Sequence, residues 1–105
     1  MTEKRVITAM PIGLRVGGDL PTPWSELFAL HVEEVDIITG TVTILQFEHE
    51  CGGILEVNDT DEGFEQMLTD LPNYLPVPQG IRDKITGLPG GTPMTLWRKD
   101  KPLLN

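Results

Sequence analysis

A helical spacing of apolar residues marks residues 60–72 of the chain. Four apolar side chains recur there with the period of an α-helix and share one of its faces: Phe64, Met67, Leu68 and Leu71. An isolated helix of about a dozen residues is only marginally stable in water. We therefore expect this apolar face to pack against the strands that precede it.

The expected ends of this helix carry residues that commonly start and stop helices. Asp59 or Thr60 can serve as the N-cap, and Glu62 is placed to close a capping box with Asp59. Pro72 and Pro76 end the helix because proline cannot continue its hydrogen bonding. The sequence thus predicts a helix capped by its own acidic start.

Runs of β-branched and aromatic residues, broken by glycine and proline, predict the strands. We expect them at residues 6–10, 12–16, 24–32, 41–49, 54–57 and 94–99. The segment 24–32 has apolar residues on both faces and is therefore expected at the centre of a sheet. Residues 78–85 are expected to form one or two helical turns. Residues 86–93 are expected to be a loop, and residues 100–105 a frayed end.

Strands that come first and a helix that follows predict an α+β fold. The expected architecture is a mostly antiparallel, strongly curved sheet of five or six strands, with the helix at about residues 60–72 packed on it. A length of 105 residues and an apolar content of 39% are enough for one modest core. We therefore expect a single domain over residues 1–105.

A succession of short motifs adds a resemblance to this pattern. It comprises a strand opening with Trp24-Ser-Glu-Leu, a hairpin, Leu55-Glu56-Val57, Gly63-Phe64, Leu68, Leu75-Pro76 and a closing strand Thr95-Leu-Trp-Arg. Over roughly residues 13–99 this succession resembles small uncharacterised bacterial domains of pleckstrin-homology-like (PH-like) character. The resemblance implies a PH-like fold and a non-enzymatic, interaction-type role, and it supplies no catalytic residue.

Charged residues are distributed unevenly along the chain. The formal net charge is −8, and every lysine and arginine lies within residues 1–15 or 82–105. Residues 16–81 carry 13 carboxylates and neither lysine nor arginine. A surface of this sign repels phosphate backbones and anionic membranes, and it attracts basic proteins. We therefore expect a basic protein as the partner, and neither nucleic acid nor a membrane.

Carboxylates in residues 33–36 are the main candidates for binding such a partner, namely Glu33, Glu34 and Asp36. A run of charges is usually a solvated loop, but a carboxylate cluster is also what a protein needs to occupy the basic active site of a nuclease. Glu62 and Glu65, on the outer side of the predicted helix, extend this anionic surface. Trp97 is the candidate apolar anchor of an interface, whereas Trp24 is expected in the core.

Residue types that could support catalysis or bind a metal ion are few. His49 and Cys51 could form a thiolate nucleophile, or hold zinc together with His31 and a carboxylate. On a strand, however, the intervening carboxylate points away from His49 and Cys51, and nothing places His31 nearby. Residues 59–62 lack the spacing of an EF-hand loop, and residues 87–91 match no phosphate-binding motif. We therefore expect a non-catalytic protein without a metal ion or cofactor.

The sequence also carries expectations about the cellular compartment. No apolar run is long enough to span a membrane, and the first residues do not form a secretory signal. Cys51 is the only cysteine, which excludes an intrachain disulfide. These features predict a cytoplasmic protein.

Two functions of different classes fit these observations. The first is a non-catalytic acidic protein-binding domain, most concretely an immunity protein or inhibitor that masks a basic partner such as a bacterial toxin. The alternative is a structural or self-associating module that forms a homodimer through an exposed edge strand or the strand of Trp97.

Overall fold

The computed structural model describes residues 5–86 and 93–99, which form an α+β fold. Six strands are present in this part of the chain: β1 (Ile7–Met10), β2 (Gly13–Val16), β3 (Leu27–Ile37), β4 (Gly40–His49), β5 (Ile54–Asn58) and β6 (Met94–Arg98). The helical segments are α1 (Phe64–Asp70), α2 (Ile81–Thr86) and the short 3₁₀ helices η1 (Trp24–Glu26) and η2 (Leu71–Asn73).

The strands form two antiparallel sheets. The larger sheet has the order β5-β4-β3-β6, with β3 and β4 at its centre and β5 and β6 at its edges. It is therefore an open sheet within the described residues. β1 and β2 form a separate hairpin. The antiparallel pairing and the number of strands confirm the α+β expectation at this level.

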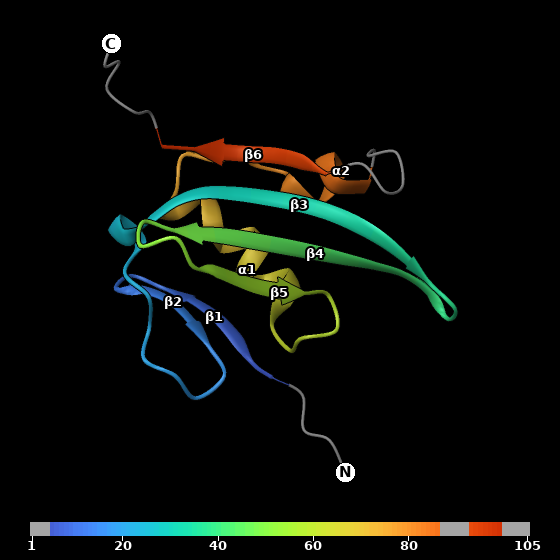
Figure 1. The fold of residues 1–105 in the computed structure, drawn as a ribbon, viewed down its shortest axis with the longest axis horizontal. Helices are drawn as coiled ribbons and strands as arrows, with labels where there is room; N and C mark the ends of the chain where they lie inside the picture. The colour runs from blue at the N-terminus through green and yellow to red at the C-terminus, as the bar shows by residue number, and fades with distance from the viewer. Residues whose placement is uncertain (1–4, 87–92, 100–105) are drawn as a thin grey trace.

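The helices cover one face of the four-stranded sheet (Figure 1). The four apolar residues of the predicted helical face are all buried, as the sequence predicts: Phe64, Met67, Leu68 and Leu71. They belong to the same cluster as the sheet residues Leu30, Val32, Leu45, Phe47 and Val57. The β1–β2 hairpin contributes Ile7, Leu14 and Val16 to this cluster. The apolar residues of both sheets and of the helices thus share one core.

The start of α1 differs from the prediction. The helix begins at Phe64 rather than near residue 60, its N-cap is Gly63, and no side chain caps it. The expected capping box between Asp59 and Glu62 does not form because its two backbone donors bond elsewhere. The N–H of Asp59 donates to Thr43 O at 3.1 Å, and the N–H of Glu62 donates to Arg5 O at 2.7 Å. Contacts with distant parts of the chain therefore replace local capping.

The central strand also differs from the prediction in its bounds. Trp24 lies in η1, so β3 starts only at Leu27, and its pairing with β4 shifts register before Ala29. At its other end β3 continues to Ile37. Residues 33–36 are therefore part of a strand, and the expectation of a solvated loop is wrong. The predicted strands at 6–10, 12–16, 41–49, 54–57 and 94–99 agree with β1, β2, β4, β5 and β6 to within about two residues.

Two expectations fall largely outside the described residues. The loop predicted at residues 86–93 lies mostly in the segment 87–92, and the frayed end predicted at residues 100–105 lies wholly outside. The helical turns predicted at residues 78–85 correspond to α2. Among the described helices, none is both long enough and apolar enough to cross a membrane.

Candidate protein-binding surfaces

β3 and β4 continue past their neighbours and project from the sheet as a long hairpin (Figure 1). β6 pairs with β3 only as far as Val32, and β5 pairs with β4 only from Ile44. Beyond these points, among the described residues, β3 and β4 form strand pairs only with each other. We call this segment, residues 33–43, the acidic arm.

The carboxylates of the acidic arm occupy both of its faces. Glu34 and Asp36 share one face because they are two residues apart on a strand, and Glu33 lies on the other. Thr43 Oγ1 donates a hydrogen bond to Glu34 at 3.3 Å. Thr41 Oγ1 donates one to Asp36 at 3.1 Å. These hydroxyl groups orient two of the carboxylates without neutralising them.

Ion pairs between described residues use other carboxylates. They are Arg5–Asp61, Arg82–Glu65, Lys99–Glu50, and the imidazole contacts His31–Glu48 and His49–Glu26. None of these pairs includes a residue of the acidic arm. The arm therefore concentrates negative charge that no ion pair among the described residues compensates.

The tip of the acidic arm is apolar. Ile37 and Ile38 are 48% and 104% exposed, in a turn that ends at Gly40. Isoleucine side chains are usually buried, and single exposed ones are common, but two adjacent ones at the end of a projecting hairpin form a distinct apolar contact point. The arm thus combines carboxylates along its length with an apolar tip.

The predicted site residues Glu62 and Glu65 lie at the start of α1 rather than on the arm. Both carboxylate oxygens of Glu65 accept hydrogen bonds from the guanidinium group of Arg82 in α2. Glu62 is exposed, and its backbone groups bond to those of Arg5 and Ile7 at 2.7 and 2.8 Å. The charge of Glu65 is therefore balanced locally, and the backbone at Glu62 ties β1 to the rest of the fold.

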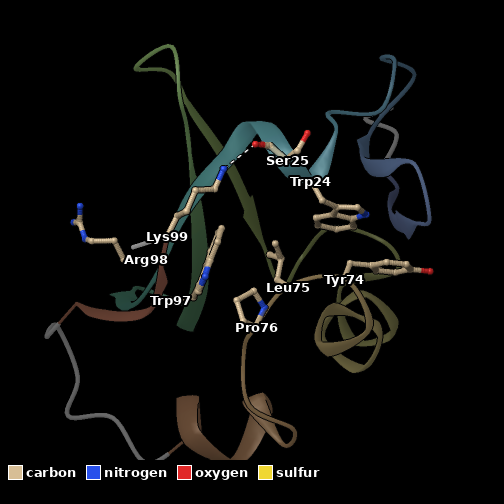
Figure 2. Close-up of a pocket in the computed structure, with 8 residues that line it drawn as sticks. All are labelled: Trp24, Ser25, Tyr74, Leu75, Pro76, Trp97, Arg98 and Lys99. Atoms are coloured by element: carbon tan, nitrogen blue, oxygen red, sulfur yellow. Dashed lines mark hydrogen bonds between the residues drawn. The ribbon is translucent and has the colours of Figure 1, made fainter. Parts of the chain in front are cut away.

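Trp97, the last predicted site residue, lines a hollow of about 520 Å³ near the start of β3. Trp24 and Tyr74 stack in parallel on one side of it, with ring centroids 5.1 Å apart, and Trp97 stands on the other side (Figure 2). Leu75 and Pro76 lie between them (Figure 2). The hollow is therefore walled by aromatic and apolar groups, as small-ligand and peptide sites usually are.

Positively charged residues mark the edge of this hollow. The ammonium group of Lys99 donates a hydrogen bond to Ser25 O at 2.9 Å (Figure 2) and another to Glu50 at 2.8 Å. The hydrogen bond and the charge of Lys99 hold the pKa of Glu50 below its usual range. Arg98 extends outward (Figure 2), with its guanidinium group 5.7 Å from the centroid of Phe28. No aspartate or glutamate is among the residues that line the hollow.

The histidines and the cysteine have structural contacts. The backbone N–H of Cys51 donates to His49 Nδ1 at 3.0 Å, so the neutral imidazole carries its proton on Nε2, which lies 2.8 Å from a carboxylate oxygen of Glu26. His31 instead contacts side chains of β4 and β6. In the part of the chain that the structure describes, no group of three or more histidine, cysteine, aspartate or glutamate residues is placed to hold a metal ion.

The predicted site residues therefore fall in three places. The acidic arm holds Glu33, Glu34 and Asp36, the start of α1 holds Glu62 and Glu65, and the hollow holds Trp97. Trp24, which we expected in the core, is only partly buried and lines the hollow, and its Nε1 donates to Met10 O at 2.7 Å. The sequence reasoning also missed Tyr74 and the apolar tip, although Ile37-Ile38 before a glycine turn was a visible signal.

Comparisons with known proteins add no assignment. A scan against protein-family models, a search of curated proteins and a search of solved structures found no match for this chain.

Proposed function

We propose that this chain is a non-catalytic, acidic protein-binding domain that masks a basic surface of another protein. Its most concrete form is an immunity protein or inhibitor that neutralises a basic toxin. The observation that carries the proposal is the acidic arm, which projects three carboxylates and an apolar tip beyond the body of the sheet.

The acidic arm supports this function better than the net charge alone. Many proteins are acidic, and evenly spread carboxylates mainly keep a protein soluble. Here, ion pairs occupy five carboxylates of the body, whereas none among the described residues involves Glu33, Glu34 or Asp36. A concentrated anionic projection accelerates encounter with a basic surface and fixes the orientation of docking.

The tip of the arm supplies the second element of an interface. Charged pairs at an interface contribute mainly specificity and rate, while a few buried apolar anchors contribute most of the affinity. Ile37 and Ile38 are positioned to enter an apolar pocket of the partner, and the three carboxylates would then face its basic rim. A basic cleft with an apolar floor, such as a nuclease active site, has this chemistry.

We also propose a PH-like fold relationship and a cytoplasmic location for this chain. A PH-like relationship is supported by the two antiparallel sheets that share one core, while the open four-stranded sheet and its two short partner strands differ from a complete seven-stranded barrel. A cytoplasmic location is supported by the exposed, unpaired Cys51.

Neutralising the arm tests the proposed function. The test variant is Glu33→Gln, Glu34→Gln, Asp36→Asn, and the matched control is Asp19→Asn, Asp70→Asn, Asp83→Asn, which removes the same charge from the body. Each protein is immobilised, exposed to extract of the native cells, and the retained proteins are identified and then measured by surface plasmon resonance. We expect a basic protein that the wild type and the control retain, with affinity for the arm variant reduced about tenfold or more.

Two results would overturn the proposal. One is equal retention of the partner by the arm variant and the wild type. The other is loss of the partner by the control variant to the same degree, because net charge rather than the arm would then determine binding.

A further inference from the structure

Two apolar features of the surface lie at opposite ends of β3. The tip of the acidic arm, Ile37 and Ile38, follows the last residues of this strand, and the aromatic hollow lies beside its first residues. A strand of 11 residues spans roughly 30 Å, so the arm of one molecule does not reach its own hollow. An arm that enters the hollow therefore belongs to another molecule.

The hollow has the features of a site for an apolar group next to a negative charge. Its walls are Trp24, Tyr74 and Trp97, its volume of about 520 Å³ suits a side chain or a short turn, and its edge carries Arg98 and Lys99. The chain has a net charge of −8, yet no carboxylate lines this hollow. Because Lys99 is paired with Glu50, Arg98 is the positive charge at this edge that no ion pair among the described residues balances.

We propose that the hollow receives the tip of the acidic arm of a second copy of this chain. In this contact Ile37 and Ile38 enter between the Trp24–Tyr74 stack and Trp97. The arm carboxylates, Asp36 foremost, lie toward Arg98 at the edge of the hollow. The occupant has the chemistry that the hollow selects, because it presents two adjacent exposed isoleucines beside uncompensated carboxylates.

The contact is heterologous, since the arm and the hollow are different surfaces of the same molecule. Each contact between two copies leaves one arm and one hollow unoccupied. This second arm and hollow either bind each other, which closes a dimer, or bind further copies. This inference goes beyond the proposed function. It gives the arm a second binding site, so self-association covers the surface that would otherwise meet a basic partner.

Two kinds of variant separate the components of the contact. The tip variant is Ile37→Ser, Ile38→Ser, which keeps the hollow and removes the occupant. The hollow variant is Ser25→Glu, which adds a bulky negative group to a residue that lines the hollow; this residue is exposed, and its side chain forms no hydrogen bond with another described residue. Trp97→Ala serves as a second hollow variant. Circular dichroism and thermal unfolding verify that each variant is folded.

Sedimentation equilibrium measures the effect of each change. The wild type is expected to show species heavier than a monomer. Each variant alone is expected to associate at least about tenfold more weakly than the wild type. An equimolar mixture of the tip variant and the Ser25→Glu variant restores one complete arm–hollow contact and is expected to form a 1:1 complex. A wild type that stays monomeric up to about millimolar concentration, or a mixture that forms no complex, overturns the proposal.

The two tryptophans provide an independent readout. Trp24 and Trp97 are the only tryptophans of the chain, and both line the hollow, so tryptophan emission reports on this site alone. Diluting the wild type should shift the emission to longer wavelength as the hollow is exposed, and the tip variant should show no such shift. Because Ser25→Glu leaves the arm intact, capture of a basic partner tests the proposed function separately from self-association.

Discussion

Gly63, the N-cap of α1, lies against β1 at a point where a side chain does not fit. Its φ angle is +87°, and a Cβ atom placed there would lie 2.5 Å from the carbonyl oxygen of Ile7. We expect Gly63→Ala to lower the free energy of unfolding by about 2–4 kcal/mol, because it adds a steric collision to the cost of a positive φ angle. Urea unfolding followed by circular dichroism measures this difference.

Gly80 supplies the matched control for this substitution. Its φ angle is +72°, but no atom lies within 4 Å of the position that a Cβ would take. Gly80→Ala therefore carries only the conformational cost, which we expect to be about 1 kcal/mol. Equal losses of stability in the two variants would show that the close approach of Gly63 to β1 contributes nothing.

Asp61 makes stability depend on pH. Burial raises its pKa, but hydrogen bonds from Arg5 and from the Asn58 backbone, with the charge of Arg5, outweigh burial and leave the pKa below its usual range. The native carboxyl group thus releases its proton at a lower pH than the unfolded one. Its contribution to stability is complete above the unfolded pKa of about 3.9 and is lost as the pH falls through the native pKa.

Asp61→Asn tests this dependence. The side chain of Asp61 is only 9% exposed, and the substitution removes a charge-assisted pair with Arg5. We expect a loss of about 1–2 kcal/mol at pH 7 and a shallower decline in stability below about pH 4. Urea unfolding at pH 3 to 7, a range chosen to bracket about 3.9, measures both effects. A decline identical to that of the wild type would contradict the assignment.

At the scale of elements, the acidic arm has fewer strand partners than the remaining residues of β3 and β4. Residues 34–37 and 40–43 have strand partners only across the hairpin among the described residues, and an isolated two-stranded hairpin is marginally stable. We expect the arm amides of β3 and β4 to exchange with deuterium about a hundredfold or more faster than those of Leu30 and Leu45. NMR detects this difference, and uniform protection along both strands would contradict it.

The elements that the sequence predicts well are those defined by local periodicity. The spacing of Phe64, Met67, Leu68 and Leu71 locates α1, because burial of one face follows directly from a helical period. The cap of α1 could not be predicted, since the backbone N–H groups of Asp59 and Glu62 donate to Thr43 and Arg5, which are distant in sequence. Local propensity at residues 59–62 favours capping, and these distant carbonyl groups override it.

For the candidate surfaces, the sequence likewise shows local features but not the contacts that depend on the tertiary fold. The carboxylates of residues 33–36 are evident as a run of charges, but their place on a projecting strand depends on where β5 and β6 stop pairing. The hollow could not be found from the sequence, because Trp24, Tyr74 and Trp97 are brought together only by the tertiary fold. From the sequence alone, a tryptophan at a predicted strand start is expected in the core, because its neighbours in the tertiary fold are not known.

For the whole molecule, the distance over which its charges repel a second copy depends on the salt concentration. The net charge of −8 repels a second copy, and the protein extends over 46 × 33 × 25 Å. The Debye length is about 30 Å at 0.01 M salt and about 8 Å at 0.15 M. At low salt two copies therefore repel each other as whole molecules, whereas at physiological salt only groups close to the contact interact.

This difference predicts opposite salt effects for the two proposed uses of the acidic arm. Raising salt from about 0.01 to about 0.15 M should strengthen self-association several-fold, because the repulsion between whole molecules is screened while the apolar arm–hollow contact persists. Over the same range, association with a basic partner should become slower, because screening weakens the attraction between opposite charges. Sedimentation equilibrium measures the self-association, and stopped-flow kinetics measures the association with a basic partner. Self-association that weakens with salt would show that charge pairing, rather than the isoleucine tip, dominates the contact.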